Sequence, residues 1–289
     1  MALKGRHINP QRFDRGQIKI LLILLPLTLF MALPIVFIIN HAFKPMEELF
    51  AFPPTFFVKS PTMDNFTKLL KFSRSAGIPL SRYVFNSLLV TVLTVGVSLL
   101  LTTCAAFAFS KIKFKGRKLM LQINQIAIMF VATAVLIPRY MVISRVGLID
   151  TVLAHVLPLV AMPVALFLVK QFVDQVPDSL IEAAHLDGAN DLQVYWKIIL
   201  PIIKPAIATA MVLVFQQVWT NMETSSYFIN DESMKTMTFY MNTLVNANSG
   251  VAGQGVSAAA SLIMFIPNLV LFIICQGSVM NTMATSGIK

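Results

Sequence analysis

The stretch EAAHLDGANDLQVYWKIILP, Glu182–Pro201, is a polar insert between two long apolar runs of the chain. Ser179 and Glu182 have the Ser-x-x-Glu spacing of a capping box, in which each side chain satisfies a backbone N–H at the start of a helix. A short helix is therefore predicted over 180–187. Gly188 follows it and can adopt the left-handed conformation in which helices commonly end.

A second short helix is expected directly after this glycine. Asn190 or Asp191 can cap it, because a short polar side chain accepts a hydrogen bond from an unpaired backbone N–H of the first turn. The helix is predicted over 192–200, and Pro201 with Pro205 breaks it, since proline removes a backbone donor. The stretch thus predicts two short helices joined by a sharp elbow.

The composition of the whole chain places this elbow in a membrane protein. Hydrophobic residues make up 56% of the chain, charged residues 12%, and the mean hydropathy is +0.75, so a soluble core cannot bury the apolar side chains. A helix needs about 20 apolar residues to cross a hydrocarbon layer about 30 Å thick. Six windows have this length: 18–40, 87–110, 120–143, 152–172, 205–227 and 258–279. We therefore expect an all-α integral membrane protein with six transmembrane helices in a single domain, 1–289.

Basic residues beside the predicted spans set the orientation. They cluster at the first span and between the second and third spans: Lys4, Arg6, Arg12, Arg15 and Lys19, then Lys111, Lys113, Lys115, Arg117 and Lys118. Because lysine and arginine concentrate in cytoplasmic loops, both clusters and both termini are expected in the cytoplasm, together with the loop 174–203 that holds the elbow. The net charge of +10 then reflects contact with anionic lipid headgroups and not with nucleic acid.

Two segments are expected outside the cell. The segment 42–83 is rich in proline and phenylalanine, and an extended strand plus a short helix near 63–72 is predicted there. It either contacts an extracellular partner or only covers helix ends. The segment 230–255 contains Asn-Ala-Asn-Ser-Gly and Gly-Gln-Gly, which favour a flexible loop or a re-entrant turn.

The elbow resembles the EAA loop of the membrane subunits of binding-protein-dependent ABC importers. That loop has Glu-Ala-Ala, a glycine six residues after the glutamate and a closing Ile-x-Leu-Pro. All these positions are matched here: Glu182, Ala183, Ala184, Gly188, Ile198, Leu200 and Pro201. The sequence Leu-Asp-Gly-Ala at 186–189, which includes Asp187, is similar to the Ile-Asp-Gly-Ala of sugar permeases. Six spans with a large loop after the first also resemble the shorter maltose-type permease subunit.

The resemblance implies a permease subunit in a bacterial cytoplasmic membrane, multi-pass, that imports a carbohydrate, specifically an oligosaccharide. It implies four kinds of partner: a second permease subunit forming a heterodimer, two ATPase subunits, an extracytoplasmic solute-binding protein and membrane lipid. In the family the elbow sits in a cleft of the ATPase, so Glu182 would be the charged contact. Ala183 and Ala184 would permit close approach and Gly188 would make the bend. Alternatively, Glu182 serves only the capping box.

Catalytic and cofactor motifs are missing from the sequence. It has no Gly-x-x-x-x-Gly-Lys-Ser/Thr, so we expect a transport subunit and not an enzyme, with no cofactor of its own and with ATP and Mg²⁺ on partner ATPase subunits. His7, His41, His155 and His185 lack metal-ligand spacing, so no metal site is expected. The alternative is an ion-gradient-driven secondary transporter, which would favour more buried carboxylates than Glu223 and internally repeated spans.

Polar residues inside the spans are the candidates for the substrate path, since each is costly in lipid unless it faces a cavity or a partner helix. Amides and carboxylates beside an aromatic ring suit the hydroxyl groups and C–H faces of a sugar. The candidates lie in the third and fifth spans: Asn124, Gln216, Gln217, Trp219, Asn221 and Glu223. The alternative for them is hydrogen bonding between helices of two membrane subunits.

Overall fold

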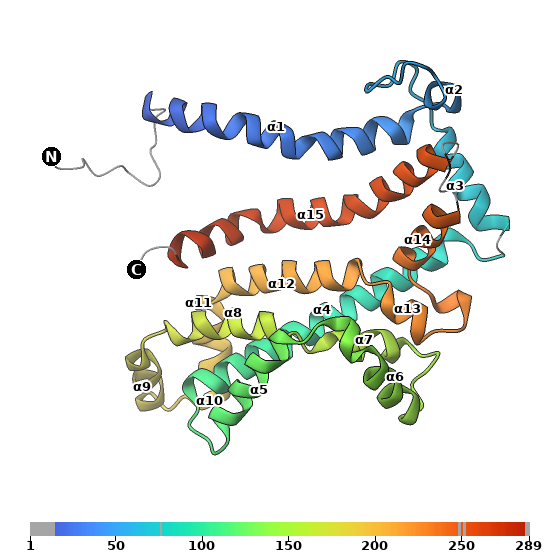
Figure 1. Cartoon of the computed structure of the whole chain (residues 1–289). Helices are drawn as coiled ribbons and strands as arrows, with labels where there is room; N and C mark the ends of the chain where they lie inside the picture. Colours follow the sequence, from blue (N-terminus) through green and yellow to red (C-terminus); the bar gives the residue numbers. More distant parts are fainter. Residues whose placement is uncertain (1–14, 76, 248–249, 251–252, 287–289) are drawn as a thin grey trace. The chain divides into compact units, whose positions relative to one another are not determined.

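The computed structural model describes residues 15–75, 77–247, 250 and 253–286, and all regular elements in these ranges are helices (Figure 1). The basic residues before Arg15 and the C-terminal tail from 287 lie outside them. The chain divides into two compact units. One comprises 1–69 with 248–262, and the other 70–247 with 263–289.

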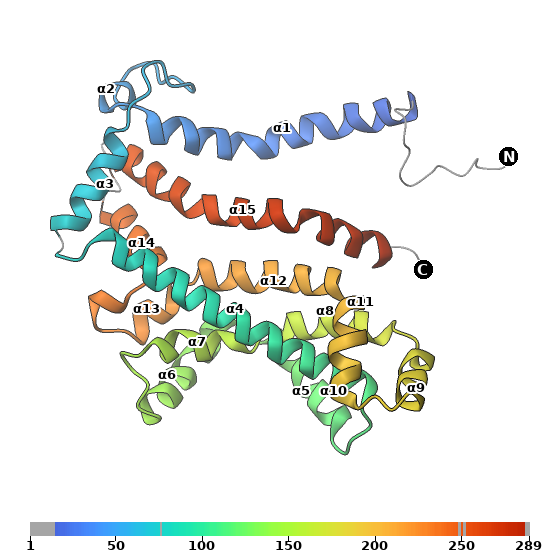
Figure 2. The same ribbon diagram turned by 180° about the vertical axis from the view of Figure 1, so that it is seen from behind.

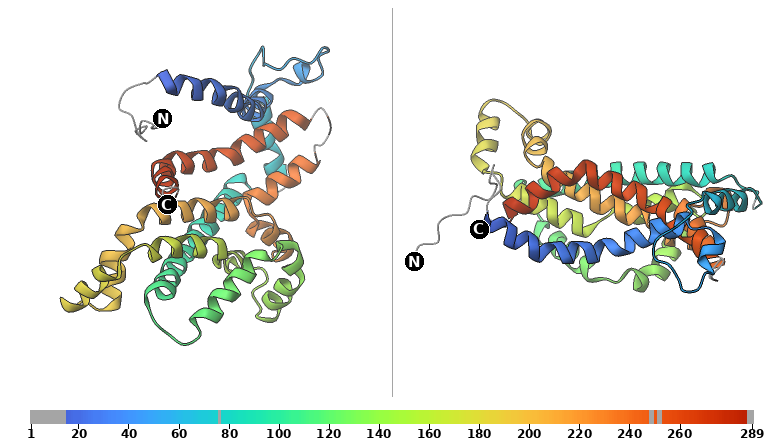
Figure 3. Two further views of the ribbon diagram at one scale, coloured as in Figure 1. Left: turned by 60° about the vertical axis from the view of Figure 1, so that its left-hand side comes forward. Right: turned by 90° about the horizontal axis from the view of Figure 1, so that it is seen from above.

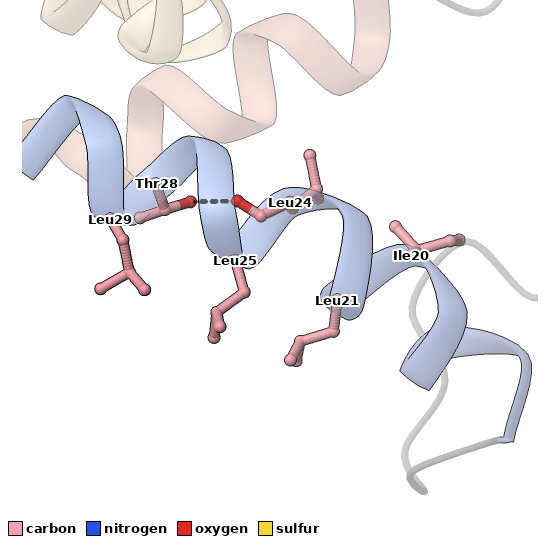
Figure 4. Close-up of a pocket in the computed structure, with 6 residues that line it drawn as sticks. All are labelled: Ile20, Leu21, Leu24, Leu25, Thr28 and Leu29. Carbon is pink, nitrogen blue, oxygen red and sulfur yellow. Dashed lines mark hydrogen bonds between the residues drawn. The ribbon is translucent and has the colours of Figure 1, made fainter.

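The first unit is built around α1 (Arg15–Phe43), which forms one continuous helix despite its two internal prolines. Its segment Ile20–Phe43 has a mean hydropathy of 2.8, and none of its most apolar window is buried inside the molecule. Figure 4 shows Leu21, Leu25 and Leu29 directed away from the helix axis on one side. The Thr28 hydroxyl donates to the carbonyl of Leu24 (2.9 Å), so the helix satisfies this polar group itself. Such a surface suits lipid and not water.

Short elements follow α1 in the same unit: α2 (Met46–Leu49) and the start of α3 (Asp64–Ser75). The strand predicted in 42–83 is wrong, because no strand occurs in the described residues of this segment. Its backbone groups bond instead to side chains. Val58 N donates to Asn40 Oδ1 (3.1 Å), and the amides of Lys59 and Ser60 donate to the carboxylate of Glu48 (3.0 and 2.8 Å). A chain engaged in this way leaves no ladder for a partner strand.

The second unit packs around α4 (Leu80–Lys111), which contacts α7 (Val152–Val160), α8 (Pro163–Asp174) and α12 (Lys204–Trp219) along its length (Figure 2). Small residues fill these contacts and are completely buried: Ala106, Ala165, Val169, Ala206 and Ala210. Small side chains let helix backbones approach closely, which stabilises helix pairs in lipid where apolar burial alone cannot.

Three of the six predicted spans are continuous helices: α1, α4 and α15 (Gln254–Ser286). The others are bent pairs. The third joins α5 (Arg117–Met129) to η1 (Ala132–Val135) and α6 (Leu136–Arg145) with a 109° bend. The fourth bends by 47° before Pro163. The fifth window, 205–227, lies in the second arm of a pair, Asp191–Ile202 with Lys204–Tyr227, that bends by 80°. Six spans result only if each bent pair crosses the membrane once, so the count of six stays a prediction.

The segment 230–255 is more ordered than the flexible loop predicted for it. It contains η3 (Glu232–Met234) and α14 (Met237–Ala247), and α14 packs on α4. Residues 248–249 and 251–252, where the glycine-rich turn was predicted, lie outside the described residues.

Candidate functional site

The elbow is formed by α9 (Asp178–Leu186) and the glycine that follows it. Gly188 has φ +84°, the left-handed conformation predicted for it. Gly188 N donates to the carbonyl of His185 (3.0 Å), and Ala189 N donates to that of Ala184 (2.9 Å). These two bonds make a Schellman motif, which closes the helix and turns the chain sharply. The elbow therefore has a defined geometry, and it extends past the ends of α8 and α12 (Figure 3).

The predicted capping box at Ser179 and Glu182 is wrong. Helix α9 begins at Asp178 after Pro177, so Ser179 already lies inside the first turn and makes no cap bond. Proline fixes φ near the helical value and so favours the earlier start. Within the described residues, the Glu182 carboxylate is exposed and has no hydrogen-bond or ion-pair partner. Glu182 therefore does not cap α9.

A complete capping box occurs one helix later. Gln193 N donates to Asn190 Oδ1 (2.8 Å), and Asn190 N donates to Gln193 Oε1 (2.9 Å). This confirms Asn190 as the cap of the second helix. This second helix starts with α10 (Asp191–Val194) and continues through the π-helical turn η2 (Tyr195–Ile199) and α11 (Leu200–Ile202). The break thus follows Ile202 and not Pro201.

Both ends of this loop are fastened to α4. At the start, Lys111 Nζ donates to the carbonyl of Val176 (2.6 Å) and to Asp178 Oδ1 (2.7 Å). The hydrogen bond and the charge of Lys111 hold the pKa of the Asp178 carboxyl below its ordinary value. In the second helix, the Tyr195 hydroxyl lies 2.8 Å from Thr103 Oγ1, and its ring lies 5.7 Å from that of Phe107.

The residues of the EAA pattern divide into an inner and an outer set. Ala184, Ile198 and Leu200 pack against the buried core. The outer set is exposed: Glu182, Ala183, Asp187, Gly188 and Pro201. Leu186 is 89% exposed and lies four residues after Glu182, on the same face of α9. The elbow thus presents an apolar side chain beside an unpaired acid, a surface suited to a protein groove with a basic residue.

Four of the six substrate-path candidates make bonds within the chain, among them the three at the C-terminal end of the fifth predicted span. Trp219 is buried, and its Nε1 donates to the carbonyl of Met264 (3.0 Å). Asn221 Oδ1 accepts from the backbone N (3.0 Å) and the hydroxyl (2.9 Å) of Thr224, which fixes the first turn of α13 (Glu223–Tyr227). Glu223 forms an ion pair with Arg139, and both side chains are only partly exposed.

The side chains of the other three candidates are more accessible to a substrate. Asn124 makes one 3.3 Å hydrogen bond to the carbonyl of Pro163. Gln216 and Gln217 are exposed on α12, and in the described part of the chain their amides have no partner. Thr220, one turn after Gln216, is exposed as well. The last turn of α12 therefore offers two amides that both donate and accept hydrogen bonds, whereas the Thr220 hydroxyl already donates to the carbonyl of Gln216 (2.6 Å).

Sequence reasoning missed two residues that contact the segment after α12, which contains α13 and η3. Arg139 is a basic residue inside a predicted span, which could have marked it as a partner for the acid Glu223. His155 is buried. Its Nδ1 lies 2.8 Å from Thr224 Oγ1 and its Nε2 lies 3.2 Å from the carbonyl of Met234. No spacing in the sequence indicates this contact, because it depends on the packing of α7 against α13.

The same segment is fastened to the start of α4. Asn86 Nδ2 donates to the carbonyls of Ser233 (2.8 Å) and Lys235 (3.0 Å), and Met237 N donates to Ser87 Oγ (2.7 Å). Helix α4 thus bonds to the segment after α12 through its first turns and to the elbow through its last turns.

Apolar helices of membrane-crossing length define a helical membrane protein, from which the elbow projects. The chain belongs to the family of inner membrane components of binding-protein-dependent transport systems, whose family model matches residues 19–276. This family consists of transport components and not of enzymes.

Relatives agree with this assignment along the whole chain. The inner membrane ABC transporter permease protein YcjP of Escherichia coli (strain K12) is 26% identical, with 100% of both chains covered. The galactooligosaccharides transport system permease protein GanQ of Bacillus subtilis (strain 168) is 28% identical, with 89% of each covered. A bacterial ABC transporter involved in the import of the acidic polysaccharide alginate has a chain with the same fold. The TM-score is 0.77 at 22% identity, covering 93% of this chain and 99% of that one. The chain is an ABC importer permease subunit.

Proposed function

We propose that this permease subunit imports an oligosaccharide handed over by an extracytoplasmic binding protein, through a path that it lines together with a second permease subunit. Relatives support the substrate class, since GanQ is named for galactooligosaccharides and AraQ of Bacillus subtilis (strain 168) for arabinooligosaccharides. The subunit spans a bacterial membrane six times with both termini in the cytoplasm. ATP and Mg²⁺ are bound by two separate ATPase subunits.

The elbow carries this proposal. Its Schellman turn fixes the direction of α9, and Lys111 and Tyr195 hold the loop at both ends, so a push on α9 moves the loop as one body. Burying Leu186 in an ATPase groove contributes about 1.5–3 kcal/mol of docking free energy. Glu182 beside it would pair with a basic groove residue, which selects the orientation of docking.

Helix α4 transmits the movement. It is one unbroken helix of 32 residues, and its bonds at Lys111 and Thr103 receive the displacement of the elbow. Its bonds at Asn86 and Ser87 pass this displacement to the segment that follows α12. A straight helix is stiff along its axis, so the two ends move together and access to the path changes with the state of the ATPases.

The path itself runs past the last turn of α12. Gln216 and Gln217 supply amide groups to sugar hydroxyls. Asn221 and Glu223 instead hold the segment after α12 in place through Thr224 and Arg139. Exposed polar groups in an apolar helix are favourable only where they face a polar cavity or a partner.

The coupling proposal is tested by reversing the charge of Glu182 in the purified complex. With Glu182→Lys, oligosaccharide-stimulated ATP hydrolysis in vesicles should fall severalfold while complex yield is retained, because the new charge repels a basic groove residue. Glu47→Lys is the matched control, since Glu47 is also exposed but lies after α1. Normal stimulation with Glu182→Lys would contradict docking through the elbow.

Membership of the binding-protein-dependent transport family argues against the ion-gradient-driven alternative, and the source of energy for uptake tests it. Uptake into vesicles should require ATP inside the compartment that holds the ATPases and should continue when ionophores collapse ion gradients. Loss of uptake on adding ionophore, with ATP present, would favour the gradient-driven mechanism instead.

A further inference from the structure

The segment after α1 carries an unusual group of aromatic side chains. Residues 50–58 contain no charge and four phenylalanines, all of them exposed: Phe50, Phe52, Phe56 and Phe57. The exposed fraction of Phe52 is 95%. Phe56 and Phe57 lie against each other, with ring centroids 5.1 Å apart. Single exposed apolar residues are ordinary, but four phenylalanines in one short segment mark a surface suited to surroundings other than water.

This segment folds back along α1 instead of extending beyond its end. The ring of Phe56 lies 6.1 Å from that of Phe37, and the two line one apolar groove with Phe30, Met31 and Pro34. Phe37 is six residues before the last residue of α1, or about 9 Å along the axis at about 1.5 Å per residue. Phe56 therefore lies level with the apolar part of the helix.

Two backbone groups of the segment bond to side chains at and just after the end of α1. Lys44 is buried, and its Nζ donates to the carbonyl of Thr55. Asn40 Oδ1 accepts from Val58 N (3.1 Å). Irregular backbone is tolerated beside hydrocarbon where its polar groups have protein partners, and Asn40 and Lys44 supply partners to two backbone groups here. The polar residues Glu48 and Lys59 border the segment on both sides and mark where water begins.

We infer that residues 50–58 form an anchor that lies in the outer interface of the membrane, with Phe50, Phe52 and Phe57 inserted among lipid acyl chains. Lipid is the occupant because Phe56 joins the segment to the apolar side of α1, whose most apolar window has no buried residue. The segment also offers no charged group by which a protein partner would be oriented. The anchor fixes the depth and tilt of α1 in the bilayer.

Spin labelling in the assembled complex tests this inference. A nitroxide is attached to Phe52→Cys or Phe57→Cys in a Cys104→Ala/Cys275→Ala background, and the complex is reconstituted in phosphatidylethanolamine/phosphatidylglycerol vesicles. Buried Cys275 can be kept if its replacement lowers complex yield. Ile23→Cys, 75% exposed on α1, is the lipid-facing control, and Asp64→Cys, exposed on α3, is the water-facing control.

We expect collisions of the label with oxygen to exceed collisions with a water-soluble nickel chelate at Phe52 and Phe57, as at Ile23, and the reverse at Asp64. A nickel response at Phe52 equal to that at Asp64 would overturn the inference, because the segment would lie in water. Exclusion of both reagents with an immobilised label would also overturn it, since a protein partner would then cover the segment.

Discussion

The hydroxyl groups of Tyr195 and Thr103 lie 2.8 Å apart and join the second helix of the elbow to α4. Thr103 Oγ1 is also 2.8 Å from the carbonyl of Leu99, to which it donates, so the Tyr195 hydroxyl is the donor between the two side chains. The contact is buried, and Tyr195 opens the π-helical turn. Single π-helical turns often occur at functional sites, as expected where force passes between helices.

Tyr195→Phe should weaken coupling without disrupting the fold. The substitution removes one hydrogen bond, worth about 0.5–1.5 kcal/mol, while the ring keeps its contact with Phe107 and Thr103 keeps its bond to Leu99. We expect normal complex yield and a reduced ratio of stimulated to basal ATP hydrolysis. Tyr227→Phe, at an exposed tyrosine, is the control. An unchanged ratio would mean that α4 does not receive its displacement through Tyr195.

Gly188→Ala should damage the elbow, because φ +84° costs a residue with a side chain about 1–2 kcal/mol. No atom lies within 4 Å of the added methyl group, so the effect comes from the backbone alone. Gly96→Ala in α4 is the matched control, since that glycine also has open space but a helical backbone, where alanine is favoured by about 0.8–1.0 kcal/mol. Thermal unfolding should shift down for the first variant and not for the second. Equal shifts would contradict the role of the turn.

The link between Lys111 and Asp178 predicts a pH dependence. The pKa of Asp178 is lowered by Lys111, so the pair stabilises the loop fully above the ordinary carboxyl value of 3.8 and loses this contribution as the pH falls through the lower folded value. Asp178→Asn should therefore lower the melting temperature at pH 7, and the difference from the native protein should shrink as the pH drops below 3.8. A difference that is the same at both pH values would show that charge is not the cause.

Gln217→Leu and Asn221→Leu should have different effects. Loss of a sugar-binding amide at Gln217 should weaken sugar binding by about 1–3 kcal/mol, which lowers uptake roughly 5-fold to 150-fold with normal assembly. Asn221→Leu removes the acceptor for Thr224, so complex yield should fall together with basal ATP hydrolysis. Uptake and complex yield are measured side by side. Normal uptake with Gln217→Leu would remove this residue from the path.

Local sequence predicts the elbow well because its geometry is set by neighbouring residues. Gly188 and Asn190 act within a few positions of themselves, and both predictions are confirmed. The capping box predicted at Ser179 and Glu182 does not form because α9 already begins at Asp178, whereas Asn190 and Gln193 form a capping box on the next helix. Local propensity also cannot predict the conformation of residues 50–58. There, Asn40 and Lys44 bond to backbone groups that a strand would use for pairing.

The candidate path is harder to predict. A polar residue inside a span needs a hydrogen-bonding partner, but the sequence does not show which residue that partner is. Glu223 pairs with Arg139, which lies 84 positions away, and Trp219 bonds to Met264, which lies 45 positions away. These partners follow from tertiary packing. The structure therefore shifts the substrate proposal from Asn221 and Glu223 to the exposed amides of Gln216 and Gln217.

The most direct test of the account is photocrosslinking from Leu186, the large apolar side chain most exposed on the elbow. A benzoylphenylalanine at this position, in the assembled complex, should give a covalent product with an ATPase subunit on illumination, and mass spectrometry should locate it in a groove beside a basic residue. The same probe at Tyr227 should give no ATPase product, because that residue lies in the segment fastened to the other end of α4. An intact, active complex with no ATPase product from Leu186 would contradict the central claim that the elbow docks on the motor.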